Sequence, residues 1–227
     1  MGFLNLDVKF LLFLPNPSDP VNPCFMVPEY LENEIKKIGE FVKNKYFNFT
    51  LFSFMIIMLT FFMNGCLIFN TVSYEIKINP DKSGTTTVLV NDIRSNAKTD
   101  ENFEEDKNNL FSYMLKSDEF IESMKKNRKN ILKRELFLKG DTLMGKAVYK
   151  FDNIKGIEGI EYDGGFYFLT LGVDDSVVAT NGEIIKSKDY KRILWDSKIN
   201  PLKFEMFSFS FDKDPYRKLA PFYNSYK

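Results

Sequence analysis

The stretch that decides the fold is the alternating sequence TVSYEIKI, at residues 71–78. Its apolar side chains at alternate positions are Val72, Tyr74, Ile76 and Ile78. A period of two is that of a strand with one buried face. Pro80 and Gly84 mark a turn, and the β-branched run at residues 85–90 supplies a returning strand. The sequence therefore predicts a β-hairpin over residues 71–90.

A helical period follows this hairpin and covers residues 100–132. Apolar residues recur there mostly at every third or fourth position, at Phe103, Leu110, Phe111, Met114, Leu115, Ile121, Met124, Ile131 and Leu132. The sequence Ser117-Asp118-Glu119 is typical of a helix start, so we expect one long helix that is broken at Lys116.

Strand-like stretches return after the helix. Residues 135–138 and 142–151 flank a Gly140-Asp141 turn and predict a second hairpin. Residues 152–160 carry Ile at every third position and favour a short helix. Further strand candidates cover residues 166–171, 177–179, 184–185, 192–195 and 203–211, whereas the tail at 212–227 holds two Pro and should be irregular. Phe207, Phe209 and Phe211 share one face of the last strand, which we expect to be buried.

The order of strands, one helix and more strands predicts an α+β fold. In such folds the helix usually lies across one face of an antiparallel sheet, and a curved sheet can also enclose a ligand cavity. We therefore expect one domain at residues 67–227, in which a curved antiparallel sheet packs against the long helix and Trp195 anchors the core.

The composition excludes several classes of function. The 227-residue chain contains no His, which excludes Ser-His-Asp triads, Cys-His pairs and His-ligated zinc or haem. Its 31 basic and 31 acidic residues balance, whereas a general nucleic-acid-binding protein carries a basic excess. Two Cys are too few for a disulfide-rich scaffold. We expect no cofactor, no metal and no nucleic-acid partner.

An uncharged apolar segment precedes the predicted domain. No charged residue occurs from Tyr46 to Tyr74, a run of 29 positions, and Phe, Leu, Ile and Met dominate residues 47–62. Four cations lie just upstream, at Lys36, Lys37, Lys43 and Lys45. Cations before an apolar run are typical both of a secretory signal and of a membrane-spanning helix. Residues 46–66 are therefore predicted to be a hydrophobic signal or anchor helix.

This segment ends in Met63-Asn64-Gly65-Cys66, which resembles the lipobox of bacterial lipoproteins. In that family the Cys thiol receives a diacylglyceryl group, and a peptidase then cleaves before the Cys. The resemblance implies that Cys66 is lipidated and that Met63, Asn64 and Gly65 complete the box. The alternative is an uncleaved single-pass helix at residues 46–66. The upstream Lys cluster places residues 67–227 outside the cytoplasm in both cases.

Residues 1–45 form an N-terminal extension that ends in the basic region. Four Pro at residues 15–23 block regular structure, and Met26 is an alternative start. Our hypothesis is that residues 1–25 are an over-extended gene start. The alternative is a genuine small cytoplasmic tail with an amphipathic helix at residues 29–42.

Three stretches of the predicted domain resemble the LppM-like lipoprotein domain of bacteria. They are Ile76-Lys-Ile-Asn-Pro-Asp-Lys-Ser-Gly84, Lys146-Ala-Val-Tyr-Lys-Phe-Asp-Asn-Ile154, and Asn181-Gly182 followed by Trp195. Members of this family are envelope lipoproteins whose domain has been linked to lipid or glycolipid binding, without a catalytic signature. The resemblance implies a lipid or another envelope component as ligand.

Two acidic groups are candidates for chemistry. Asn79, Asp81 and Ser83 match the first half of a calcium loop, but the loop requires Glu at position 90, which is Val, so a plain turn is favoured. Paired carboxylates can cleave glycosides. A second acidic group could supply them, at Glu158, Glu161, Asp163, Asp174 and Asp175. It keeps a carboxylate-dependent envelope hydrolase as an alternative function.

A basic cluster lies at the predicted end of the long helix. Its members are Lys125, Lys126, Arg128, Lys129, Lys133 and Arg134. Cations at this position complement the helix dipole, and beside a membrane they also form a patch that contacts anionic headgroups. The sequence thus predicts a bacterial envelope lipoprotein, anchored through Cys66, whose extracytoplasmic domain binds a ligand or has a structural role and is not an enzyme.

Overall fold

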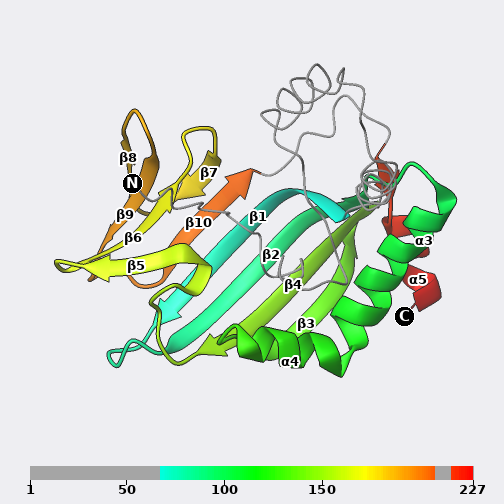
Figure 1. The fold of residues 1–227 in the computed structure, drawn as a ribbon, viewed down its shortest axis with the longest axis horizontal. Coiled ribbons are helices and arrows are strands. Elements are labelled where there is room, and N and C mark those ends of the chain that lie inside the picture. The colour runs from blue at the N-terminus through cyan, green and yellow to red at the C-terminus, as the bar shows by residue number, and fades with distance from the viewer. Residues whose placement is uncertain (1–66, 208–215, 227) are drawn as a thin grey trace, which may run out of the picture.

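The computed structural model describes residues 67–207 and 216–226, which form two antiparallel sheets and several helices (Figure 1). The large sheet has the strand order β3-β4-β2-β1-β10-β7, and β11 pairs with β2. Its strands are β1 (Leu67–Ile78), β2 (Gly84–Ser95), β3 (Asn130–Lys139), β4 (Thr142–Phe151), β7 (Ser176–Thr180), β10 (Leu202–Phe207) and β11 (Arg217–Lys218). The small sheet has the order β5-β6-β9-β8, with β5 (Ile160–Asp163), β6 (Phe166–Leu171), β8 (Glu183–Lys186) and β9 (Lys191–Asp196). This architecture confirms the α+β class.

The β1–β2 hairpin runs in continuous antiparallel register from Ile78 and Gly84 at the turn to Leu67 and Ser95 at the other end. In the turn, Asp81 Oδ1 accepts hydrogen bonds from the backbone amide and the hydroxyl of Ser83, at 3.1 and 2.7 Å. The predicted hairpin is confirmed, and both strands extend beyond the predicted bounds.

The predicted long helix is present, and it is broken where the sequence indicated. It consists of α3 (Asp100–Asn108), the π-helical segment η1 (Asn109–Met114) and α4 (Asp118–Lys126). Ser117 Oγ accepts a hydrogen bond from the amide of Phe120 at 3.3 Å and thereby caps α4. The face toward the sheet is buried through Phe103, Leu110, Phe111, Met114, Phe120 and Met124.

The helix ends earlier than predicted, because the chain turns sharply after Lys126. Arg128 has a φ of 63°, in the left-handed region. The amides of Arg128 and Lys129 donate to the carbonyls of Lys125 and Met124, which is the Schellman pattern of a helix end. Residues 130–132 belong to β3, so the prediction that they are helical is wrong.

The short helix predicted for residues 152–160 is reduced to the 3-10 turn η2 (Ile157–Gly159). Gly156, Glu158 and Gly159 all have positive φ angles, which a longer helix does not permit. The regular spacing of Ile154, Ile157 and Ile160 reflects burial instead, since each is at most 1% exposed.

The face of β10 that lies in the core is the opposite of the predicted one. Phe204 and Met206 are buried, whereas Phe207 is 38% exposed. The strand register explains why Phe204 rather than Phe207 faces the core. Phe204 pairs with Tyr74 of β1, and their ring centroids lie 4.6 Å apart. Phe209 and Phe211 lie outside the described residues.

Most of residues 216–226, which belong to the predicted irregular tail, form regular elements, and residues 212–215 and 227 lie outside the described residues. They form β11, η3 (Ala220–Phe222) and α5 (Tyr223–Tyr226). The ring of Phe222 packs edge-on against Phe103 at 5.4 Å, and Tyr226 stacks on Phe111 at 4.6 Å. These aromatic contacts hold the end of the chain on the helical layer, and they override the Pro residues that predicted an irregular tail.

One hydrophobic core joins all layers. The helices lie over the β3–β4 side of the large sheet, and the small sheet lies beside β10 and β7 (Figure 1). Trp195 of β9 is fully buried, as predicted, and its ring lies 5.8 Å from that of Phe204. One face of the large sheet is therefore used by the core.

The predicted anchor helix at residues 46–66 and the extension at residues 1–45 lie outside the described residues. Within residues 67–207 and 216–226, no helix is both long enough and apolar enough to cross a bilayer.

The start of β2 supplies a test of this packing. A Cβ at Gly84 would lie 2.1 Å from the carbonyl oxygen of Lys77 and 2.6 Å from Cζ of Phe151. We expect Gly84→Ala to lower the free energy of unfolding by about 2–3 kcal/mol, because the hairpin backbone must shift. Thermal unfolding in detergent, followed by the fluorescence of Trp195, measures this. Gly140→Ala is the control, since nothing lies within 4 Å of its Cβ and its φ of +63° costs only about 1 kcal/mol. Equal losses for the two variants would contradict the register.

Candidate functional site

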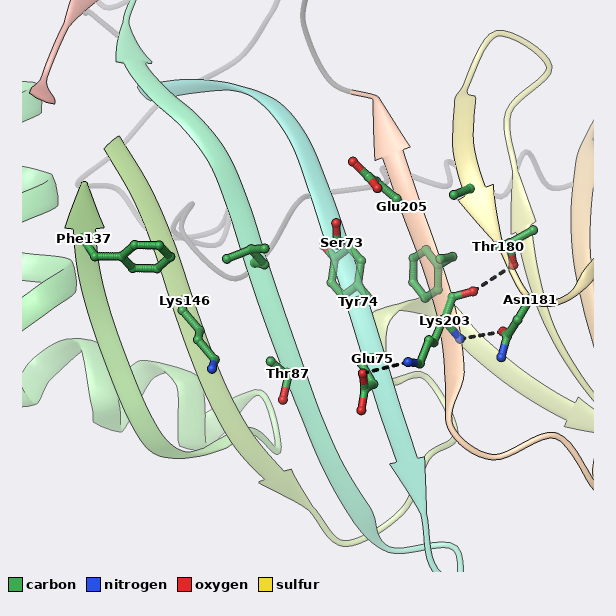
Figure 2. Close-up of a pocket in the computed structure, with 13 residues that line it drawn as sticks. Ser73, Tyr74, Glu75, Thr87, Phe137, Lys146, Thr180, Asn181, Lys203 and Glu205 are labelled. Carbon is green, nitrogen blue, oxygen red and sulfur yellow. Dashed lines mark hydrogen bonds and ion pairs between the residues drawn. The ribbon is translucent and has the colours of Figure 1, made fainter. Parts of the chain in front are cut away.

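The face of the large sheet that points away from the helices carries a hollow of about 610 Å³ (Figure 2). We call this side the open face; its side chains include Ser73, Glu75, Thr87, Leu89, Lys146, Lys203 and Glu205. The hollow extends from Phe137 of β3 to Ala179, Thr180 and Asn181 at the end of β7. Its volume lies within the range of pockets for small ligands.

The strand register arranges the open face in rows that cross the sheet. The middle row contains Glu205, Ser73, Leu89, Lys146 and Glu135, each opposite the next. The row on the side of the β1–β2 turn contains Lys203, Glu75, Thr87, Val148 and Lys133. Two hairpins, β1–β2 and β3–β4, and the distant strand β10 therefore supply one continuous surface.

The β7 side of the hollow is fixed by hydrogen bonds. Asn181 Oδ1 accepts from the amide of Lys203 at 2.8 Å and from Nε1 of Trp195 at 2.9 Å. Thr180 Oγ1 donates to the carbonyl of Lys203 at 2.8 Å. Because Trp195 is fully buried in the core, this edge is rigidly connected to it.

Glu75 and Glu205 bring two carboxylates into the hollow. Glu75 lies 3.1 Å from Lys203 Nζ and 3.5 Å from Lys77 Nζ. The hydrogen bond from Lys203, together with its charge and with Lys77, lowers the pKa of Glu75 below its ordinary value. Glu75 is therefore ionised at neutral pH and is unsuited to donate a proton.

Two of the acidic residues predicted as a possible catalytic group have partners within the fold. The side chain of Glu158 is 6% exposed, Lys129 Nζ lies 2.6 Å from its Oε1, and the hydroxyl of Tyr149 donates to the same oxygen. Asp175 accepts a hydrogen bond from the amide of Gly172 at 2.6 Å. No group of three potential metal ligands occurs in the part of the chain that the structure describes.

The basic residues predicted as a headgroup patch are distributed over different surroundings. Lys129 is 5% exposed and paired with Glu158. Arg134 donates to the carbonyls of Met114 and Ser117, both at 2.9 Å, and so completes the end of the helix before α4. Arg128 donates to the carbonyl of Lys155, and Lys133 lies on β3 beside Glu135 at 2.8 Å. Lys125, Lys126, Arg128 and Lys133 are exposed, whereas Lys129 is buried and Arg134 is half-buried, so Lys129 does not belong to a surface patch.

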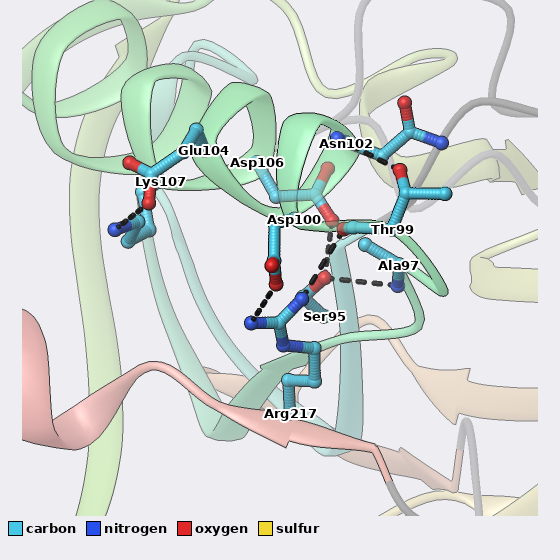
Figure 3. Close-up of polar contacts among 9 residues, drawn as sticks. All are labelled: Ser95, Ala97, Thr99, Asp100, Asn102, Glu104, Asp106, Lys107 and Arg217. Atoms are coloured by element: carbon cyan, nitrogen blue, oxygen red, sulfur yellow. Dashed lines mark hydrogen bonds and ion pairs between the residues drawn. The ribbon is translucent and has the colours of Figure 1, made fainter.

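A buried carboxyl group lies where β2 meets α3 (Figure 3). Asp106 is 2% exposed, and its Oδ2 accepts a hydrogen bond of 2.5 Å from Ser95 Oγ. Burial raises the pKa of Asp106 to about 6, although the hydrogen bond from Ser95 acts in the opposite direction. Nearby, Arg217 binds Asp100 at 2.9 Å and the carbonyl of Thr99 at 3.2 Å.

The predicted lipobox, Met63 to Cys66, lies outside the described residues. The first described residue, Leu67, is also the first residue of β1. The attachment point that the sequence predicts is thus directly joined to the large sheet.

The sequence did not reveal the hollow. The sequence feature that relates to the hollow is the pair of polar residues Ser73 and Glu75, which alternate with the apolar residues of β1. Their neighbours Leu89, Lys146 and Lys203 became apparent only from the register.

No protein family, curated protein or solved structure matches this chain. The resemblance to LppM-like domains therefore stays a prediction.

The raised pKa of Asp106 predicts how the free energy of unfolding depends on pH. Its folded pKa lies above the value of about 3.9 for a free Asp, so its stabilising protonation is complete below pH 4 and is lost as pH rises through 6. Asp106 alone should make the wild type about 1 kcal/mol more stable at pH 5 than at pH 8. Asp106→Asn should remove this difference, and the exposed Glu101→Gln should retain it. Thermal unfolding at both pH values measures it, and an unchanged pH dependence in Asp106→Asn would exclude this role.

Proposed function

We propose that this chain is a membrane-anchored, non-catalytic binding protein of the bacterial envelope. The observation that carries the proposal is the hollow on the open face, because the core occupies the other face of the same sheet. A rigid surface presented by several strands is suited to holding a ligand.

The lining of the hollow favours an amphipathic ligand. Leu89 and Phe137 supply apolar contacts, Ser73 and Thr87 supply hydroxyl groups, and Lys146 supplies a cation. Membrane lipids and lipid-linked envelope components combine an apolar part with a polar one, and they match this mixture better than a purely polar metabolite.

Binding is favoured over glycoside hydrolysis by the state of the carboxylates. Hydrolysis requires one carboxyl group that is held protonated. In the hollow, Lys203 and Lys77 stabilise the charged form of Glu75. The buried Glu158 is occupied by Lys129 and Tyr149.

The anchor follows from residues 46–66 of the sequence. An acylated Cys66 would attach through lipid chains, whose insertion contributes about 0.8 kcal/mol per buried CH₂. An uncleaved helix would attach the same domain by spanning the bilayer. The domain is extracytoplasmic in both cases.

A photoreactive residue in the hollow tests ligand binding in cells. We expect p-benzoylphenylalanine in place of Phe137 to form an adduct with a small amphipathic molecule on irradiation, because this side chain lines the hollow. Mass spectrometry of the purified protein identifies the adduct. The same replacement at Phe166, which is 40% exposed on the small sheet, is the matched control. Absence of any adduct at position 137, or equal adducts at both positions, would contradict the proposal.

The intact mass of the native protein from bacterial membranes tests the anchor. We expect a chain that starts at Cys66 and carries diacylglyceryl and acyl groups. An uncleaved, unmodified mass would exclude the lipobox and establish the single-pass alternative, and Cys66→Ser should abolish any lipid-derived mass increase.

A further inference from the structure

The small sheet has a second face, opposite to the one that is packed in the core. Tyr167 and Trp195 pair with each other and are buried on the core side. Their neighbours along β6 and β9 alternate to the other side, where the register places Phe168 opposite Leu194. Phe166 on this side is 40% exposed, so no described element covers it. We call this side the outer face of the small sheet.

Carboxylates flank the apolar centre of the outer face on both sides. In one row Phe166 lies between two aspartates, and in the next row Phe168 and Leu194 lie between two glutamates. These acidic residues, which we call the acidic borders, are Asp163 and Glu161 on β5, Asp196 on β9 and Glu183 on β8. Among the residues that the structure describes, none of the four forms an ion pair. Their negative charge is therefore not balanced within the described fold.

Arg192 is the cation that the paired rows place on this face, and it is engaged by its neighbours. Its Nε donates to Thr170 Oγ1 at 3.1 Å. Its guanidinium lies 4.7 Å from the ring centroid of Phe168 and 5.0 Å from that of Tyr190. Arg192 also lies one row beyond the acidic borders, opposite Ile185 of β8. The acidic borders are thus left for a cation from another molecule.

The charge of the outer face restricts the class of partner. A second copy of this chain would bring the same carboxylates together across a two-fold axis, and like charges repel. Anionic lipid surfaces and nucleic acids are unfavourable for the same reason. A complementary partner supplies an apolar stripe with Lys or Arg on both sides of it.

The spacing of the acidic borders fits the width of an α-helix. Adjacent strands are about 4.8 Å apart, so the backbones at Asp163 and Asp196 are separated by about 10 Å, and those at Glu161 and Glu183 by about 14 Å. A helix with its side chains is about 10–12 Å wide. Consecutive rows are about 7 Å apart along the strands, and residues i and i+4 of a helix are about 6 Å apart along its axis. A helix that lies along β6 therefore places apolar residues on both rows.

We propose that the outer face of the small sheet binds a basic amphipathic helix of a partner protein. The apolar stripe of that helix packs on Phe166, Phe168 and Leu194, and its Lys or Arg side chains bind the acidic borders. Capture of an amphipathic helix through its apolar side chains is a common mode of peptide recognition. This surface is separate from the hollow and involves neither the proposed ligand nor the anchor.

A synthetic helix tests this recognition on the full chain in a non-ionic detergent. The probe has about 14 residues, which corresponds to roughly 21 Å of helix and to the length of the six-residue strand β6. It carries photoreactive leucine along one stripe, Lys on both sides of that stripe, and a lactam bridge on its far side that keeps it helical. We expect adducts at Phe166, Phe168 or Leu194 after irradiation, located by mass spectrometry. Adducts at Phe137 and Leu89 in the hollow instead, or no adducts, would overturn the proposal.

Neutralisation of the acidic borders tests the contribution of charge. The variant combines Glu161→Gln, Asp163→Asn, Glu183→Gln and Asp196→Asn. Its matched control changes the net charge equally at four exposed residues of α3 and α4, through Glu101→Gln, Glu105→Gln, Glu119→Gln and Glu122→Gln. We expect about tenfold less labelling in the first variant, because four charge pairs are lost, and unchanged labelling in the control. Equal losses would show non-specific attraction and overturn the assignment.

A charge exchange distinguishes lost contacts from misfolding. Asp163→Lys combined with Asp196→Lys should weaken labelling by the Lys probe and strengthen labelling by a probe that carries Glu in place of each Lys. A misfolded protein would gain no labelling at these positions, and the fluorescence of Trp195 during thermal unfolding reports whether the fold is retained. A folded exchange variant without this gain would overturn the proposal.

Sedimentation of the full chain in detergent tests the alternative occupant. We expect no self-association through this face. A dimer that Phe166→Ser abolishes would assign the outer face to a second copy and overturn the proposal. None of these outcomes affects the proposed function, which is tested at position 137 in the hollow, and a partner protein captured at position 166 differs in mass from the small-molecule adduct expected at position 137.

Discussion

The alternation of β1 is the constraint on which the rest of the structure depends. Every second side chain from Val72 to Ile78 enters the core, and pairing with β2 on one side and β10 on the other extends this division across the sheet. A slip of one residue would exchange the faces, exposing the core side chains and burying Glu75 and Lys77. The helices then cover part of one side, and the other side carries the hollow.

Local patterns predicted the parts of the fold that local interactions determine. Both hairpins and the start of α4 at Ser117 follow from turn and capping residues. The predictions that were wrong concern features that depend on distant contacts or on backbone geometry, which the spacing of apolar residues does not encode. Spacing cannot show that Arg128 adopts a left-handed conformation, or that stacking on Tyr74 brings Phe204 rather than Phe207 into the core.

The candidate site was less predictable than the fold, because five strands contribute to it. The sequence indicated that Ser73 and Glu75 point away from the core, but not that Lys146 and Lys203 lie across from them or beyond. The basic cluster shows the converse case, in which residues that are close in sequence lie in different surroundings. Its members are close in sequence, yet Lys129 and Arg134 satisfy a buried carboxylate and helix-end carbonyls, respectively. Clustering in the sequence therefore did not show which of these side chains are exposed and which are used inside the fold.

The position of the last residues has a consequence for biogenesis. β11 pairs with the end of β2, and Tyr226 stacks on Phe111 of the helical layer. The first strand, β1, likewise gains its second neighbour from β10, near the other end of the chain. These pairings join segments that are far apart in sequence, so the contacts of β1 and β2 are completed only after the intervening elements have been synthesised.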